Sequence, residues 1–151
     1  MDYLYRQLSP SDVSVMKKLQ GVFGEAFGDR AAYQDQVPRD EYLQSLLSKD
    51  HFIALVCQTN NTVVGGLAAY VLEKFEQERK EIYIYDLAVL EEHRRRGIAS
   101  GLIKELQKTG KAIGAYVIYV QADKGEEDKP AIALYESLGT KEDVYHFDIP
   151  V

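Results

Sequence analysis

The sequence predicts an α/β (α+β) fold in a single domain that spans residues 1–151. The first observation is a run of β-branched and aromatic residues over 82–90, which predicts a largely buried strand. The second is the turn at Gly97 and the amphipathic helix that follow this strand. The third is composition, because 151 residues of which 46% are hydrophobic suffice for one core but not for two ordinary domains.

The first third of the chain is predicted to contain a strand and two helices. Residues 3–8 form the strand, and the capping side chains of Ser9-Pro10-Ser11-Asp12 precede a helix over residues 13–27. A polar loop over residues 33–38 then leads to a short second helix over residues 40–47.

A β-hairpin is predicted next. Apolar runs over residues 51–58 and 62–71 flank Asn60-Asn61, a pair of residues that favours tight hairpin turns. Gly65-Gly66 inside the second run predicts a bulge or the close approach of another backbone. A charged connection then leads to the central strand.

The helix after the central strand is predicted to begin at Gly97 and to end near Lys108 and Gly110. Its apolar residues fall on one face at helical spacing, namely Ile98, Leu102, Ile103 and Leu106. A strand over residues 115–122, a helix over residues 129–138 and a last strand over residues 144–149 complete the prediction.

Charge and composition exclude several classes of protein. The net charge of −6, from 18 basic and 24 acidic residues, disfavours nucleic-acid binding and suits a cationic substrate. No apolar run is long enough to span a bilayer and Met1-Asp2-Tyr3 does not begin a signal peptide, so we expect a cytoplasmic protein without membrane contact. The single cysteine, Cys57, excludes an internal disulfide and is expected to be a buried, unreactive side chain. The three histidines show no ligand spacing, so we expect no metal.

A basic glycine turn joins the central strand to the next helix. Arg94, Arg95 and Arg96 precede Gly97, which has no side chain where an anion would approach. Because a helix N-terminus carries unpaired backbone N–H groups and about half a positive charge, this turn predicts a cradle for a diphosphate. The alternative is a solvated, arginine-rich helix start without a ligand.

The turn matches the pattern Arg/Gln-x-x-Gly-x-Gly/Ala, with Arg94, Gly97 and Ala99 at the defined positions. At this turn the chain resembles the GNAT N-acetyltransferases. The resemblance implies a mixed, mostly antiparallel central sheet with helices on both faces and splayed central strands. It also implies acetyl-CoA as cosubstrate. The residues that would bind it are Leu87, Ala88 and Val89 of the central strand and Arg94, Arg95, Arg96, Gly97, Ile98, Ala99 and Ser100 of the turn.

Longer blocks narrow the resemblance to the GNAT-type aminoglycoside 3-N-acetyltransferases. The most specific are Val-Gly-Gly-Leu-Ala-Ala-Tyr-Val at 64–71, Glu-Ile-Tyr-Ile-Tyr-Asp-Leu-Ala-Val at 81–89, Gly-Ala-Tyr-Val-Ile-Tyr-Val-Gln-Ala-Asp at 114–123 and His-Phe-Asp-Ile at 146–149. This likeness implies direct acetyl transfer to the 3-amino group of 2-deoxystreptamine antibiotics, an activity of the antibiotic-resistance type, and a homodimer. The loop at 124–129 is longer and more charged than its counterpart, which bears on substrate range.

Two residues are implied to take part in the chemistry. Asp86 matches an aspartate that acts as a base or orients the amine, because an alkyl ammonium must lose a proton before it can attack. Tyr135 matches a tyrosine beside the coenzyme sulfur, where a phenol can donate a hydrogen bond to the departing thiolate. The alternatives are a strand carboxylate paired with a local cation and a tyrosine packed on the sheet.

Acidic side chains are expected to bind a polycationic aminoglycoside through their summed field and through charge-assisted hydrogen bonds. The predicted set is Glu81, Asp86, Asp123 and Asp148, with Glu126, Glu127 and Asp128 as further candidates. Tyrosines accompany them at positions 83, 85, 116 and 119; most are expected to pack in the sheet and a minority to stack on sugar rings.

Two other functions remain open at this point. An acetyltransferase for another amine, such as a polyamine, a small amine or a protein amino group, would carry the same cradle. A non-catalytic acyl-CoA-binding sensor would also keep it, although the presence of Asp86 and Tyr135 weighs against a sensor.

Overall fold

The computed structural model describes residues 1–151, which form two compact units, residues 1–121 and residues 122–151. The strands of the first unit are β1 (Leu4–Gln7), β2 (Phe52–Thr59), β3 (Thr62–Glu73), β4 (Lys80–Val89) and β5 (Ala115–Val120). Its helices are α1 (Val13–Phe27), α2 (Asp40–Leu47) and α3 (Ile98–Ile113), with short turns η1 (Pro10–Asp12), η2 (Ala31–Asp35) and η3 (Glu91–His93). The first two helices have the predicted bounds. None of the helices combines the length and the apolar composition that crossing a membrane requires.

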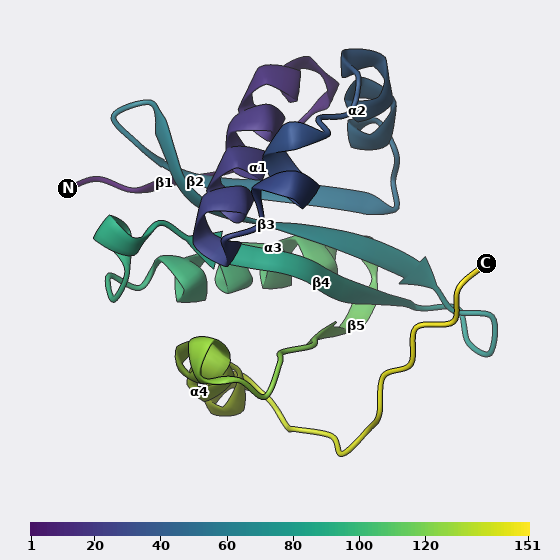
Figure 1. Ribbon diagram of the computed structural model, residues 1–151. Coiled ribbons are helices and arrows are strands. Elements are labelled where there is room, and N and C mark those ends of the chain that lie inside the picture. Colours follow the sequence, from purple (N-terminus) through teal and green to yellow (C-terminus); the bar gives the residue numbers. More distant parts are fainter. The chain divides into compact units, whose positions relative to one another are not determined.

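The five strands form one sheet in the order β1-β2-β3-β4-β5. Neighbouring strands run antiparallel from β1 to β4, whereas β4 and β5 are parallel and are joined through α3. Within this unit, α1 and α2 cover one face of the sheet and α3 covers the other (Figure 1). The predicted mixed, mostly antiparallel sheet with helices on both faces is therefore confirmed.

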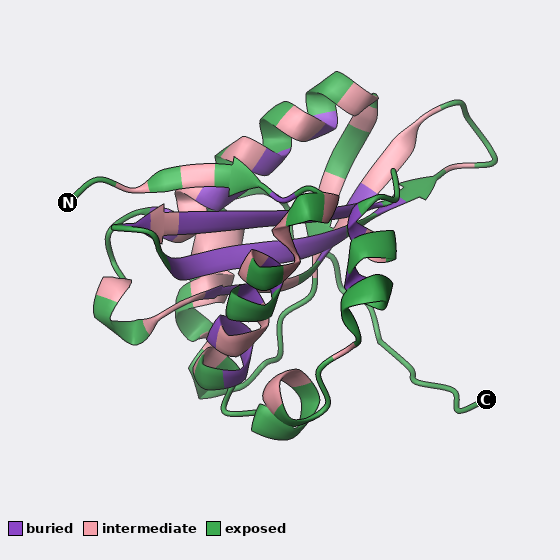
Figure 2. Ribbon diagram, turned by 90° about the horizontal axis from the view of Figure 1, so that it is seen from above, coloured by how far each residue is buried: buried purple, intermediate pink, exposed green.

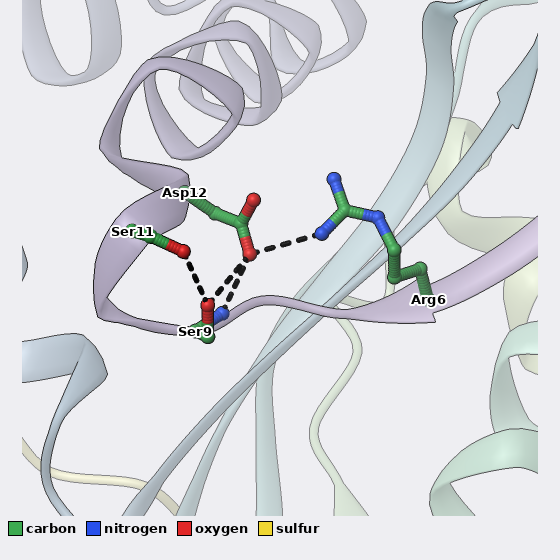
Figure 3. A network of polar contacts seen from close by, with 4 residues as sticks. All are labelled: Arg6, Ser9, Ser11 and Asp12. Carbon is green, nitrogen blue, oxygen red and sulfur yellow. Dashed lines mark hydrogen bonds and ion pairs between the residues drawn. The ribbon is translucent and has the colours of Figure 1, made fainter.

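A small polar network fixes the start of α1 (Figure 3). The Asp12 carboxylate accepts hydrogen bonds from the backbone N–H of Ser9 at 2.8 Å and from the Ser9 hydroxyl at 3.0 Å. It also pairs with the Arg6 guanidinium at 2.9 Å. The backbone hydrogen bond from Ser9 is the largest of the effects that together lower the pKa of Asp12. These contacts tie the end of β1 to the first helical turn, as the predicted capping side chains require.

The β2–β3 hairpin has the tight turn and the bulge that its sequence predicts. Asn60 and Asn61 both have positive φ, 50° and 60°, the conformation of a type I′ turn. The register of the two strands shifts next to Gly65. A Cβ at Gly66 would lie 2.5 Å from the carbonyl oxygen of Leu55, so only glycine allows this approach. The predicted bulge and the predicted close approach are both confirmed.

Apolar side chains fill both faces of the sheet, and the buried residues of the first unit follow its strands and the inner sides of its helices (Figure 2). Almost fully buried side chains include Leu19, Phe23 and Leu43 from α1 and α2, and Ile98, Leu102 and Leu106 from α3. Cys57 is buried within β2, and burial raises the pKa of its thiol to about 11. The predicted burial of this cysteine is confirmed, and the raised pKa keeps the thiol protonated at neutral pH.

The second unit contains a short turn, η4 (Glu126–Asp128), and helix α4 (Lys129–Leu138), which has the predicted bounds. Residues 139–151 follow as an extended tail that contains no strand, and every residue in it is exposed. The strand predicted over residues 144–149 is therefore wrong for the single chain. A strand requires a neighbour for its backbone hydrogen bonds, and the second unit by itself contains no strand that could supply one.

Candidate active site

A β-bulge in β4 decides where the side chain of Asp86 points. Asp86 pairs with Ala68 of β3. The next pair joins Ile84 to Ala69, so Tyr85 is an extra residue on β4. An extra residue turns the side chains that follow it to the other face of the sheet. Ile84 is buried on one face, and Asp86 consequently projects from the opposite face, which α1 covers.

Tyr33 holds the Asp86 carboxylate on this face. The Tyr33 hydroxyl donates a hydrogen bond to Oδ2 of Asp86 over 2.9 Å, and Tyr33 lies in η2, the single π-helical turn that follows α1. Its ring packs against Phe23 and Phe27 of α1, with centroid distances of 5.8 and 5.7 Å. This aromatic contact positions the hydroxyl, which in turn positions the carboxylate.

Burial changes the acidity of both partners. Burial raises the pKa of Asp86, and the hydrogen bond from Tyr33 opposes this shift only in part. Burial likewise raises the pKa of Tyr33, and the Asp86 carboxylate raises it further. Tyr33 is therefore a neutral donor at physiological pH, and Asp86 is a better proton acceptor than an ordinary aspartate.

Four tyrosines of β3, β4 and β5 form a partly exposed aromatic surface near this carboxylate, which we call the tyrosine face. Its members are Tyr70, Tyr83, Tyr85 and Tyr119. The rings of Tyr83 and Tyr119 stack in parallel with centroids 4.7 Å apart, and Tyr85 meets both Tyr70 and Tyr83 edge-on at 5.9 Å. Tyr85 is 60% exposed. Such rings offer flat apolar surface together with hydroxyl groups, a combination that suits a sugar ring.

Glu81 already has partners within the protein. Its carboxylate accepts a hydrogen bond from the Tyr116 hydroxyl and pairs with Lys74 at 3.5 Å. The Arg79 guanidinium lies 3.8 Å above the Tyr116 ring. The hydrogen bond from Tyr116 is the first of the effects that lower the pKa of Glu81. The predicted substrate ligand is therefore a carboxylate whose charge is balanced by two nearby cations.

The basic turn has the backbone that an anion cradle needs. Arg95 and Gly97 both have positive φ, 61° and 78°, before α3 begins at Ile98. The first bond of the helix runs from the Gly101 N–H to the Gly97 carbonyl over 2.9 Å. The N–H groups of residues 98–100 consequently have no acceptor within the helix. Alternating left-handed residues before free N–H groups form a concave donor set for phosphate oxygens.

Arg94 differs from its two neighbours because its guanidinium is used inside the protein. Its Nε donates a hydrogen bond to the Val89 carbonyl over 3.0 Å, which ties the end of β4 to the turn. Arg95 and Arg96 are exposed and make no ion pair. The two free guanidinium groups therefore add positive charge beside the free N–H groups.

The central strands separate beyond the tyrosine face. Pairs between β4 and β5 run from Lys80 with Ala115 to Ile84 with Val120, and β4 continues unpaired on this side to Val89. The predicted splay of the central strands is confirmed. The backbone around Leu87, where an extended ligand is predicted to pair, has no β5 neighbour.

Three of the predicted site residues belong to the second unit. Burial is the main cause that raises the pKa of Tyr135 on α4 to about 12, and the nearby Asp128 charge adds to it. The Asp123 carboxylate is exposed, and the backbone N–H of Asp123 donates to Asp128 over 2.9 Å. Asp148 in the tail pairs with His146 at 2.9 Å.

Sequence reasoning missed Tyr33 and Tyr70. Tyr33 lies in a segment predicted to be polar loop, and its partner on β4 is 53 residues away. The aromatic residues Phe23 and Phe27 at helical spacing, followed by Tyr33 after a glycine break, are the local signal that could have located it.

Comparison with solved structures finds close likeness over the full length. An aminoglycoside acetyltransferase, HMB0005, from an uncultured soil metagenomic sample is 58% identical, with a TM-score of 0.99 over 100% of this chain and 99% of that chain. A second such enzyme, meta-AAC0020, also from an uncultured soil metagenomic sample and solved in complex with sisomicin, is 32% identical, with a TM-score of 0.90 over 99% and 96% of the two chains.

More distant relatives are acetyltransferases too. An N-alpha-acetyltransferase of Saccharolobus solfataricus is 35% identical over 101 residues, which are 60% of this chain and 55% of the relative. The chain spans about half the length of the curated relatives it matches. Residues 16–140 match the acetyltransferase (GNAT) family, in agreement with the sheet, the splayed strands and the basic turn. This chain belongs to the GNAT family of acetyltransferases.

Proposed function

We propose that this protein is an acetyl-CoA-dependent aminoglycoside 3-N-acetyltransferase that acts on 2-deoxystreptamine aminoglycosides. The observation that carries the proposal is the half-buried Asp86 carboxylate, which Tyr33 holds beside the partly exposed tyrosine face. A carboxylate next to flat aromatic surface is complementary to an amino sugar, which carries an ammonium on an apolar ring. Similarity to two aminoglycoside acetyltransferases, one of them solved with sisomicin, supports the same substrate class.

Asp86 is proposed to receive the reacting amine. The carboxylate aligns one substrate ammonium by a charge-assisted hydrogen bond and accepts a proton from it, directly or through water. The raised pKa of Asp86 favours this transfer, because the carboxylate is more basic than an ordinary aspartate. Tyr33 fixes one carboxylate oxygen, so the other oxygen is left for the amine.

The residues of the basic turn fit acetyl-CoA. The free N–H groups of residues 98–100 and the left-handed backbone at Arg95 and Gly97 would hold its pyrophosphate, with Arg95 and Arg96 as counter-charges. The unpaired backbone of β4 over residues 87–89 would hold its pantetheine arm. Acetyl-CoA supplies the acetyl group as a thioester.

The residues of the second unit are assigned supporting roles. Tyr135, whose pKa is raised to about 12, keeps its proton and would donate a hydrogen bond to the sulfur of the departing thiolate. Asp123 and Asp148 are proposed to bind further ammonium groups of the substrate. Glu81 would act with them, although Lys74 and Tyr116 already engage its carboxylate.

The direct test is release of free thiol from acetyl-CoA by the purified protein in the presence of sisomicin and other 2-deoxystreptamine aminoglycosides. We expect turnover, and we expect NMR spectra of the product to show acetylation of the 3-amino group. Acetylation at another amino group would overturn the 3-N assignment but not the substrate class. Absence of thiol release with every aminoglycoside would contradict the proposal itself.

The substitution Asp86→Asn tests the proposed role of Asp86. Asp86→Asn keeps the shape and can still accept the Tyr33 hydrogen bond, but it removes the charge and the base. We expect the rate to fall about 100-fold or more, with acetyl-CoA affinity unchanged by calorimetry. Asp50→Asn, at an exposed turn before β2, is the matched control and should keep the full rate. An unchanged rate in Asp86→Asn would remove Asp86 from the mechanism.

A second candidate is acetylation of another amine, and the similarity to an N-alpha-acetyltransferase favours a protein amino group. The same assay with spermidine and with short peptides separates these substrates from aminoglycosides. A non-catalytic sensor would bind acetyl-CoA and release no thiol with any amine. The cytoplasmic location and the homodimer stay predictions.

A further inference from the structure

Four residues that pair across the sheet form a row beneath the start of α3. Residues directly opposite each other on neighbouring antiparallel strands point to the same face of the sheet, so the whole row shares one face. Helix α3 lies against each of the four strands that contribute to it. We call these residues the supporting row, and in order from β1 to β4 they are Tyr5, Cys57, Gly65 and Val89.

The middle of the supporting row carries little side-chain volume, which lets the first turn of α3 approach the sheet. A Cβ at Gly65 would lie 3.1 Å from the carbonyl oxygen of Ala88 and 3.3 Å from Cγ2 of Ile98, the first residue of α3. Ile98 is almost fully buried, as is Cys57 beside Gly65. Glycine at this position therefore leaves the space in which Ile98 packs on the sheet.

The two ends of the supporting row also contact the basic turn and the helix that follows it. At one end, the Val89 carbonyl accepts the hydrogen bond from Nε of Arg94 over 3.0 Å. At the other end, the Tyr5 ring lies against Gly101, where a Cβ would be only 2.5 Å from Cζ of the tyrosine. These contacts bracket residues 94–101, which include the free N–H groups at the start of the helix.

A second tyrosine of the N-terminal segment holds the residue just before the basic turn. Tyr3 is two positions before Tyr5 and therefore points to the same side of the extended chain. Its hydroxyl is hydrogen-bonded to Nδ1 of His93 over 3.0 Å, and the two rings meet edge-on with centroids 5.9 Å apart. His93 directly precedes Arg94, so the N-terminal segment contacts the chain on both sides of the turn.

We propose that Tyr3, Tyr5 and Gly101 are positioning residues for acetyl-CoA. They fix the backbone N–H groups of residues 98–100 relative to β4, where the pantetheine arm is proposed to lie. A set of donors binds a diphosphate tightly only when it already has the bound geometry before the ligand arrives. This inference rests on the proposed function, because it concerns the site of the proposed cosubstrate.

The first test is Gly101→Ala, with the affinity for coenzyme A measured by calorimetry. The new Cβ would meet the Tyr5 ring and push the first turn of α3 away from the sheet. We expect the affinity to fall about tenfold. Alanine is a better helix former than glycine, so a weaker helix would not explain this loss. Circular dichroism checks that the variant is folded.

The matched control is Gly110→Ala, the same change near the other end of α3. A Cβ there would lie 3.1 Å from the terminal methyl group of Ile82, a side-chain atom that can move. This variant should bind coenzyme A as tightly as the wild type does.

A compensating substitution tests whether Tyr5 and Gly101 act together. Tyr5→Leu shortens the side chain and leaves room for the Cβ of Gly101→Ala. The double variant should therefore recover most of the affinity that Gly101→Ala loses. A double variant that binds no better than Gly101→Ala would contradict the role of Tyr5.

The contact between Tyr3 and His93 has a separate test. Tyr3→Phe removes the hydrogen bond and keeps the ring, and we expect about a threefold loss of affinity for coenzyme A. Tyr3→Phe combined with His93→Leu should lose no more than His93→Leu alone, because the two residues act through one bond. Full additivity of the two losses would contradict the role of Tyr3.

Pantetheine, which is coenzyme A without its diphosphate and nucleotide, distinguishes positioning of the N–H groups from general damage. By NMR titration, Gly101→Ala should bind pantetheine as the wild type does, because no phosphate reaches the turn. Equal losses for both ligands, or an unchanged affinity for coenzyme A, would overturn the proposal. No amine is present, so the result does not depend on which amine is acetylated. A wild type that bound no coenzyme A would instead overturn the proposed cosubstrate, and this inference with it.

Discussion

At the scale of single residues, the hydrogen bond from Tyr33 to Asp86 affects both the stability of the fold and the proton affinity of the carboxylate. Burial raises the pKa of Asp86, so the native state binds a proton more readily than the unfolded chain does. Any stability that this carboxyl contributes is present below its unfolded pKa and is lost as the pH rises through the higher native pKa. A charged, half-buried Asp86 therefore costs stability at neutral pH, which is consistent with a residue kept for its reactivity.

Tyr33→Phe tests this coupling. The variant removes the hydrogen bond that lowers the pKa of Asp86, so that pKa rises further while the aromatic contacts with α1 remain. If ionised Asp86 is the active form, the acidic limb of the pH–rate profile for acetyl transfer moves to higher pH, by about one unit.

The matched control for this measurement is Tyr42→Phe, because the Tyr42 side chain is 59% exposed and its hydroxyl makes no hydrogen bond within the protein. Its acidic limb should coincide with that of the wild type. A Tyr33→Phe profile that also coincides with the wild type would show that Tyr33 does not tune Asp86.

At the scale of elements, local sequence signals predict the helices well, but they do not predict how the strands pair. The bounds of α1, α2 and α4 follow from caps and amphipathic spacing, which are properties of neighbouring residues. The bulge at Tyr85 depends on how β4 is registered against β3, so alternation along β4 alone assigns Asp86 to the wrong face. The tail shows the opposite case, because its alternation predicts a strand over residues 144–149, whereas the structure has no strand there.

The turn before α3 can be tested by a change in backbone conformation alone. A Cβ at Gly97 would meet open space, but φ of +78° is strained for alanine. Gly97→Ala should therefore cost about 1 kcal/mol of stability and move the turn. We expect the affinity for acetyl-CoA, measured by calorimetry, to fall roughly tenfold, because the free N–H groups no longer converge.

Gly28→Ala separates the strain from the ligand effect. Gly28 ends α1 with φ of +63°, and a Cβ there would also meet open space. The two variants should lose similar stability in thermal unfolding. Only Gly97→Ala should bind acetyl-CoA more weakly, and an equal loss of affinity in both would argue against the cradle.

At the scale of the whole molecule, opposite charges are divided between the global surface and one turn. The chain carries a net charge of −6, yet three arginines are consecutive at Arg94, Arg95 and Arg96. A polycation is attracted by the net charge from any direction, whereas an anion is attracted only near the turn. In the proposed reaction, this division would let one small protein collect two ligands of opposite sign at separate sites.

The same division predicts how salt changes catalysis. Salt shortens the range of electrostatic attraction from roughly 30 Å at 0.01 M to roughly 8 Å at 0.15 M. With acetyl-CoA kept saturating, kcat/KM for a cationic aminoglycoside such as sisomicin should fall several-fold over this range, while kcat stays nearly constant. Long-range steering acts on encounter and not on the bound complex, so the effect belongs in KM. If kcat fell as much as kcat/KM, salt would be disturbing the short-range contacts of Asp86 instead, and the net charge would have no part in collecting the substrate.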